Sequence, residues 1–283
     1  MFEFPDAIRF NAGQYVEDFI HWLKEYYGFV FDAIGNFVLQ ILLYISDFLL
    51  WLPWWAVIII IFLLGWWLRT FALGVTFAIL LFIIGSFHLW DHMMSTLAIV
   101  VTAVIIALII GIPIGILMAY GRKFEIFMKP ILDFMQTMPA FVYLIPAIIF
   151  FGLGDVPAIF ATLIYCAPPV IRLTNLAIRG VSSEMVEAAQ SFGSSRWQLL
   201  SKVQLPQALP TIMTGANQTT MMALAMVVIS SMVGAKGLGQ DVLGAINHID
   251  IAQGFEAGLS IVFLAIIIDR LTIGIANRFN VKK

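Results

Sequence analysis

Long apolar runs separated by short polar segments dominate the hydropathy pattern of this chain. A helix that crosses a bilayer needs about 20 mostly apolar residues, and lipid offers backbone groups no partner outside the helix itself. No strand-like alternation is present, so the pattern predicts an all-α polytopic membrane protein with about seven transmembrane helices. The predicted spans lie near residues 53–68, 70–87, 95–120, 131–151, 156–178, 208–233 and 255–275.

The first 50 residues differ from the rest because acidic side chains are mixed with aromatic ones. Residues 14–31 predict an amphipathic helix that lies in the membrane interface. Residues 36–50 are apolar but short and contain Asp47, which favours a second interfacial or re-entrant helix and leaves a true span open. The predicted divisions are an interfacial region 1–50, two accessory transmembrane helices 51–90, a core 91–275 with a cytoplasmic loop 180–206, and a basic tail 276–283.

Composition agrees with the membrane class. Hydrophobic residues make up 61% of the chain and charged residues 11%, against about 45–50% and about 25% in soluble domains. A net charge of −2 argues against a nucleic-acid partner. The single cysteine and four scattered histidines form no metal or catalytic pattern, so we expect neither catalytic residues nor a metal site in this chain.

The distribution of basic residues sets the expected orientation. With seven spans and loop 180–206 inside, only Arg9, Lys24 and Lys236 fall outside, and all other lysines and arginines are cytoplasmic. The positive-inside rule then places the N-terminus outside and the C-terminus in the cytoplasm of a cell-membrane protein.

The loop at 180–206 is a polar interruption between two apolar segments. It predicts a short helix, a turn at Gly193, and a second helix closed by Pro206. Phe192 and Trp197 are unfavourable in an aqueous loop unless a partner covers them, so the loop is predicted to dock a soluble protein. The alternative is an amphipathic helix that rests on the membrane. The motif residues are Glu187, Ala188, Ala189, Gly193, Leu205 and Pro206.

This spacing resembles the "EAA" loop on which the ATPase sits in permease subunits of bacterial ATP-binding-cassette importers, with Val203 where isoleucine is usual. The stretches 133–146 and 217–239 look like those of glycine betaine and proline betaine permeases, closest to the short Gram-positive OpuA type. The resemblance covers roughly residues 90–275 and implies the type I importer permease fold. We therefore expect an importer for quaternary-ammonium osmolytes.

The resemblance also implies the partners. These are a second permease copy in a homodimer, two ATPase subunits that carry the ATP and Mg²⁺, and an extracellular lipid-anchored binding protein that delivers the substrate. No Walker motif occurs in this chain, so no cofactor is expected on it and ATP hydrolysis is expected elsewhere. Carnitine or choline is an alternative substrate. An ATP-independent secondary transporter would need ionisable residues within the spans, and an intramembrane enzyme would need a catalytic pair.

Prolines mark the expected transport path. Pro139 and Pro146 are predicted to interrupt one span, and Pro168-Pro169 the next. Discontinuous helices commonly line a substrate path, although kinks can also serve packing alone. A quaternary ammonium favours aromatic faces. The candidate path residues are Pro139, Phe141, Tyr143, Pro146 and Asn217.

Three smaller features have structural interpretations. Gly111 and Gly115 are spaced four apart, which predicts close helix packing. The glycines at 234, 237 and 239 predict a flexible external turn. His88 and His92 are expected to be interfacial anchors.

Overall fold

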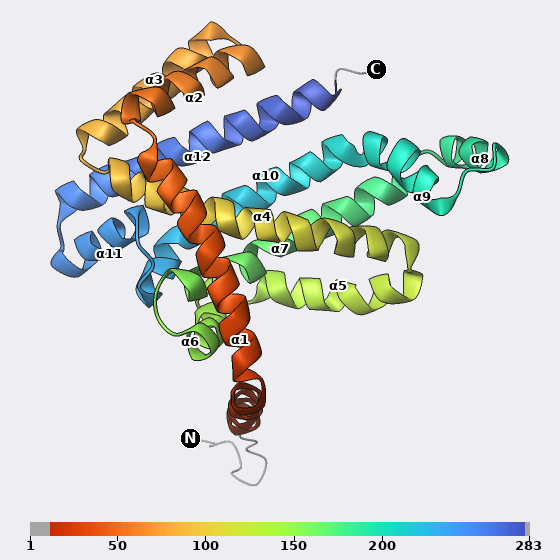
Figure 1. Cartoon of the computed structure of the whole chain (residues 1–283), viewed down its shortest axis with the longest axis horizontal. Helices are drawn as coiled ribbons and strands as arrows, with labels where there is room; N and C mark the ends of the chain where they lie inside the picture. Colours follow the sequence, from red (N-terminus) through yellow and green to blue (C-terminus); the bar gives the residue numbers. More distant parts are fainter. Residues whose placement is uncertain (1–11, 281–283) are drawn as a thin grey trace, which may run out of the picture.

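The computed structural model describes residues 12–280, and all regular elements in that range are helical (Figure 1). The predictions for residues 1–11 and 281–283 lie outside the described residues. Three helices form the centre, and each packs on the other two: α4 (Trp90–Tyr120), α7 (Asp155–Arg179) and α10 (Leu205–Ser230). Helix α12 (Ile251–Asn280) packs on α10. Five helices are long and apolar enough to cross a bilayer, and a bent pair could form a sixth.

Close approach of α4 and α7 confirms the packing interpretation of Gly111 and Gly115. A Cβ at Gly111 would lie 2.6 Å from a methyl of Val170, and one at Gly115 would lie 2.7 Å from the Ile171 carbonyl oxygen. Neither position has room for a side chain. The two glycines therefore let the α7 backbone lie directly against α4.

The N-terminal region forms one helix, α1 (Ala12–Trp51), so the prediction of two separate elements at 14–31 and 36–50 is wrong. No proline interrupts the join, and Gly35 is buried against Phe151, where a Cβ would lie 3.2 Å from the ring. The helix has 40 residues, about 60 Å of length. Its segment Gly13–Trp51 has the length and hydropathy of a membrane-crossing helix, and in Figure 1 it runs steeply across α4.

The two accessory helices form a hairpin that packs on α12. Helices α2 (Trp54–Leu68) and α3 (Phe71–Ser86) have 15 and 16 residues, so each is shorter than a bilayer requires when upright. Arg278 near the end of α12 donates a 2.8 Å hydrogen bond to the Trp67 carbonyl, and its guanidinium lies 3.7 Å from the ring centre of Trp67. The seven predicted spans therefore differ in length, and α2 and α3 are too short to cross a bilayer upright.

The span predicted at 131–151 is two helical pieces with a bend of 110° between them. Helix α5 (Arg122–Thr137) ends before Pro139, and the 3-10 helix η2 (Ala140–Tyr143) leads into α6 (Leu144–Phe151). Met138 is extended, at φ −65° and ψ 135°, because a following proline disfavours the helical conformation. The break predicted at Pro139 is present, whereas Pro146 lies within the first turn of α6, where a missing N–H costs nothing.

The predicted interruption at Pro168-Pro169 is wrong. Both prolines are buried within α7, which continues without a break to Arg179. Packing against α4 and α10 on either side holds the helix together where two N–H donors are missing. The remaining connections are the 3-10 turn η4 (Ser231–Val233) and helix α11 (Leu238–His248), which link α10 to α12.

Candidate functional site

The polar loop begins with α8 (Ser183–Ser191), none of whose residues is buried. The helix ends in a Schellman motif: the Gly193 N–H donates to the Gln190 carbonyl at 2.9 Å, and the Ser194 N–H donates to the Ala189 carbonyl at 3.1 Å. Gly193 has φ +78°, a conformation that favours glycine. Gly193 thus follows the Glu-Ala-Ala run at the spacing that a Schellman motif at the end of α8 requires.

The chain re-enters a helix at once. Ser195 and Gln198 form a capping box, with N–H···O distances of 3.3 and 2.9 Å. Helix α9 (Arg196–Gln198) continues through a π-helical turn, η3 (Leu199–Gln204), directly into α10. The prediction that Pro206 closes this helix is wrong. The helix continues through Pro206, at the start of α10, because the wider π-helical turn comes directly before it. In that turn the Leu205 N–H donates to the Leu200 carbonyl.

Large aromatic side chains project from this segment into the surroundings. Phe192 is 91% exposed and Trp197 is 73% exposed. Glu187, Ala188 and Pro206 are also exposed, while Ala189 and Leu205 are partly covered. At the base of the segment, Leu200, Ala208 and Ile212 pack with Ala177 and Ile178 of α7. The segment is therefore firmly anchored at its base and uncovered at its tip.

A groove of about 910 Å³ runs beside the exposed aromatics. Its walls are the end of α4, including Leu117 and Tyr120, and the residues Arg196 and Trp197 of α9. The Tyr120 hydroxyl donates to the side-chain carbonyl of Gln204, which fastens α4 to the π-helical turn. In Figure 1, α8 and α9 lie at the end of the helix bundle opposite α11. This end thus combines a groove with exposed aromatic side chains.

Ion pairs that the sequence analysis missed join α5 to α7 near this end. Glu125 lies 2.6 Å from the Arg179 guanidinium and 2.9 Å from the Lys129 ammonium. Arg179 also donates to the Met118 carbonyl at 3.0 Å and to the Asn175 side chain at 3.1 Å. Asp133 pairs with Arg172 about two helical turns away on each helix. The exposed surface of α5 is mixed, with the apolar residues Ile126, Phe127 and Phe134 beside charged and polar ones.

The candidate path residues do not form one surface. Phe141 beside the bend is 54% exposed, whereas Tyr143 is 4% exposed and donates a hydrogen bond to the Met135 carbonyl. Asn217 donates to the Asp269 carboxylate on α12 at 2.9 Å. Asp269 is an ionisable residue inside the predicted span 255–275, and the sequence analysis overlooked it. Of the two candidate aromatic residues, only Phe141 is thus exposed.

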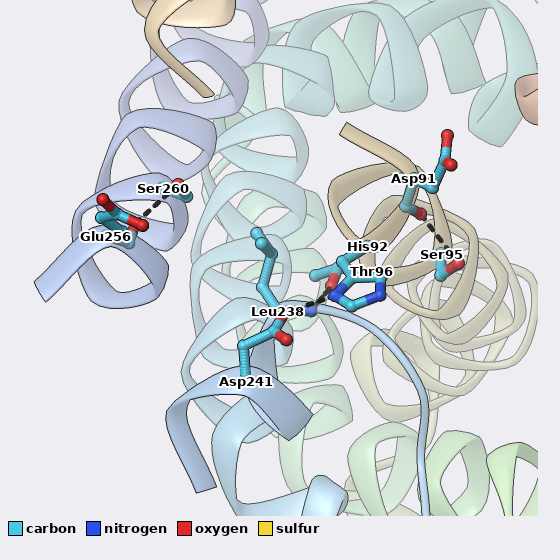
Figure 2. Close-up of polar contacts among 8 residues, drawn as sticks. All are labelled: Asp91, His92, Ser95, Thr96, Leu238, Asp241, Glu256 and Ser260. Atoms are coloured by element: carbon cyan, nitrogen blue, oxygen red, sulfur yellow. Dashed lines mark hydrogen bonds and ion pairs between the residues drawn. The ribbon is translucent and has the colours of Figure 1, made fainter. Parts of the chain in front are cut away.

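The glycines at 234, 237 and 239 do not form the flexible turn that was predicted. Figure 2 shows this turn fastened to the start of α4 by two contacts: the Leu238 N–H donates to the Thr96 hydroxyl oxygen at 2.8 Å, and His92 Nδ1 lies 2.6 Å from Asp241 Oδ2. His92 therefore has a carboxylate partner and is more than an interfacial anchor. Within residues 12–280, no group of three metal-ligating side chains could hold a metal ion.

Comparison with known families decides the class of this chain. Residues 111–281 match the model of the family "Binding-protein-dependent transport system inner membrane component". The chain belongs to this family. The inner membrane component is thus a multi-pass membrane protein of a transport system.

Three curated relatives share most of its length. The glycine betaine/carnitine transport permease protein GbuB of Listeria monocytogenes is 46% identical over 95% of this chain and 96% of that protein. The glycine betaine/proline betaine transport system permease protein ProW of Escherichia coli is 44% identical over 91% and 73%. The glycine betaine transport system permease protein OpuAB of Bacillus subtilis is 42% identical over 93% and 94%.

Among solved structures, this chain is similar to a chain of the MetNI methionine ABC transporter in inward-facing conformations. The TM-score is 0.62 at 23% identity, and the match covers 68% of this chain and 95% of that chain. At this identity the likeness concerns the fold, which is that of a type I ATP-binding-cassette importer permease.

Proposed function

We propose that this chain is the permease subunit of an ATP-driven importer for quaternary-ammonium osmolytes, with glycine betaine or proline betaine as the principal substrate. The relatives that span almost the whole chain are named as glycine betaine permeases, which supports the substrate class. Carnitine and choline carry the same quaternary ammonium and are the alternative substrates. The substrate reaches this chain from a lipid-anchored extracellular binding protein. Selection of the substrate therefore takes place on that partner, before the substrate meets this chain.

The exposed tip of the α8–α9 segment is the observation that carries the coupling mechanism. Phe192 and Trp197 leave large apolar faces uncovered at the end of a firmly anchored helical segment. Such a patch is stabilised when a partner buries it. We assign it to the ATPase, two copies of which bind two permease copies and hydrolyse ATP with Mg²⁺. This assignment places the α8–α9 end and the C-terminus in the cytoplasm. The N-terminus then lies outside the cell membrane if α1 stays in the interface, as predicted, and inside if α1 crosses the bilayer.

Coupling follows from the way this segment is built into the helices. The segment continues without a break into α10, and the end of α7 packs against its base. A displacement of the tip by the ATPase is therefore transmitted directly to α10 and to the end of α7. The chain itself performs no chemistry in this scheme, because ATP hydrolysis takes place on the partner.

Copurification tests the docking assignment. Replacing Phe192 with alanine removes a central apolar anchor, and such anchors commonly contribute about 2 kcal/mol or more to binding. We expect the amount of ATPase that copurifies with Phe192→Ala to fall strongly. Leu153→Ala is the matched control, because Leu153 is 75% exposed but lies on the connection between α6 and α7 at the other end of α7. Equal retention of the ATPase by both variants would contradict the assignment.

Competition for uptake tests the substrate class. Proteoliposomes that contain the permease, the ATPase and the binding protein should accumulate labelled glycine betaine, and unlabelled proline betaine should compete. Carnitine and choline, tested in the same way, rank the alternatives. If none of these compounds is taken up or competes, the quaternary-ammonium assignment is wrong.

A further inference from the structure

Residues 234–241, which connect α10 to α11 and include the first turn of α11, are tightly packed against neighbouring helices; we call this segment the wedge. Gly237 has φ +106°, and a Cβ there would lie 2.4 Å from the Thr96 hydroxyl oxygen and 2.9 Å from the His92 carbonyl oxygen. A Cβ at Gly239 would lie 2.4 Å from the Val227 carbonyl oxygen of α10. Leu238 between them is fully buried. The wedge is therefore pressed against both α4 and α10 with no room for additional atoms.

Side chains from two helices tie this wedge in place. On α4, the Thr96 hydroxyl oxygen accepts the Leu238 N–H, and His92 contacts Asp241 at 2.6 Å. At the start of α7, the Asp155 carboxylate accepts the Lys236 N–H at 2.8 Å, and the Gly154 N–H donates to the Val233 carbonyl at 2.8 Å. The turn thus connects α4, α7 and α10 at one end of the bundle, and the α8–α9 segment lies at the other end (Figure 1).

The hydrogen bonds that hold the wedge differ in how easily they can break. Thr96 and Leu238 are fully buried, so separating them would leave a donor and an acceptor without partners. The His92 side chain is 51% exposed and that of Asp241 is 11% exposed. Water can therefore replace the imidazole as a partner of Asp241 when the two side chains separate. Figure 2 shows Asp91, the neighbouring carboxylate, away from Asp241 and outside this contact.

We infer that residues 234–241 close the transport path at the end opposite the ATPase, and that the His92–Asp241 pair is the releasable contact that holds them shut. This inference rests on the proposed function. Because α7 and α10 also bear the coupling segment, a movement there must act against the contacts that join the wedge to α4. His92 and Asp241 are thus positioning residues for the transport cycle and do not touch the substrate.

Thiol accessibility tests the role of the His92–Asp241 contact without any substrate. A cysteine in place of Ala235, which is 2% exposed within the wedge, should react slowly with a membrane-impermeant reagent added from outside. Adding His92→Ala should speed its reaction by about tenfold or more, since a hydrogen bond to a charged group is lost. His92→Asn, which can still donate, should restore slow labelling. Asp91→Asn is the matched control and should have no effect. Equal labelling rates for all four chains would overturn the inference.

A cross-link gives a second measurement. In a chain with Cys166→Ala, the pair His92→Cys and Asp241→Cys should form a disulfide on oxidation, which thiol counting detects. Uptake should stop in the oxidised protein and return on reduction. Continued uptake by the cross-linked protein would overturn the inference. The absence of betaine uptake in the unaltered chain would contradict only the proposed function, because the labelling experiment needs no substrate.

Discussion

Gly193 illustrates how one residue's backbone conformation can determine a surface. It has φ +78°, and a Cβ there would meet nothing within 4 Å, so the requirement for glycine comes from backbone strain and not from crowding. Gly237 has a positive φ as well, but its Cβ would collide with α4. The spacing of residues predicted the first turn correctly. It could not predict the second, because the sequence does not show which atoms lie opposite a missing side chain.

Replacing Gly193 with valine should weaken the docking surface without unfolding the chain. The β-branched residue would strain the left-handed turn by about 1–3 kcal/mol, and the strain should displace Phe192 and Trp197 from their docking positions. We expect normal membrane insertion with reduced ATPase copurification and reduced uptake. Gly258→Val is the control, because that glycine also has open space but no positive φ. Unchanged uptake in Gly193→Val would argue against the role of this turn.

Phe141 and Tyr143 should respond differently to replacement by leucine. Phe141 is half exposed, and a cation–π contact there would contribute about 0.5–2 kcal/mol. Phe141→Leu should therefore lower the maximal uptake rate modestly and leave the half-saturating concentration unchanged. Tyr143→Leu should instead lower the melting temperature in detergent, since it loses the bond to Met135. A tenfold change in half-saturating concentration, with binding-protein affinity unaltered, would show that this chain itself selects the substrate.

At the scale of helices, the ion-pair cluster between α5 and α7 should stabilise the helix ends that lie near the α8–α9 segment. Arg179 contacts Glu125, Asn175 and the Met118 carbonyl, whereas Lys129, whose side chain is 60% exposed, pairs with Glu125 alone among residues 12–280. Arg179→Met should therefore lower the melting temperature in detergent more than Lys129→Met, because it leaves several groups without a partner. The reverse ranking would show that the cluster does not contribute in this way.

The long apolar helices could be predicted from sequence, and their joins could not. Helices α4, α7 and α12 match the predicted spans because each is a continuous apolar run that lipid obliges to be helical. The two predicted elements are fused into α1, whose Gly35 packs against Phe151 of α6. The continuous path through Pro206 depends on one wider turn. Both are consequences of tertiary contacts or local geometry that hydropathy does not encode.

At the scale of the whole molecule, the contacts agree with the predicted alternation of sides. Three connections are predicted to be external, around residues 88–92, 152–155 and 234–241. The third touches the first through Asp241–His92 and the second through Lys236–Asp155. At the opposite end, Arg278 meets Trp67 and Tyr120 meets Gln204. The absolute orientation was predicted from the basic residues.

Single cysteines test that orientation. A thiol at Ser194 should be labelled only from the cytoplasm, and one at Gln240 only from outside. The unaltered chain should remain unlabelled in both experiments, because Cys166 is fully buried. Labelling of both positions from the same side would contradict the crossing between them, and labelling from the exchanged sides would invert the orientation.

The most direct test of the account is ATP-dependent uptake of glycine betaine by the reconstituted complex. Proteoliposomes that hold the permease and the ATPase, with binding protein outside and ATP and Mg²⁺ inside, should accumulate labelled glycine betaine above its external concentration. Accumulation should cease without ATP and should fall in the Gly193→Val variant. Concentrative uptake by the permease alone, driven by an ion gradient, would contradict the account and identify a secondary transporter.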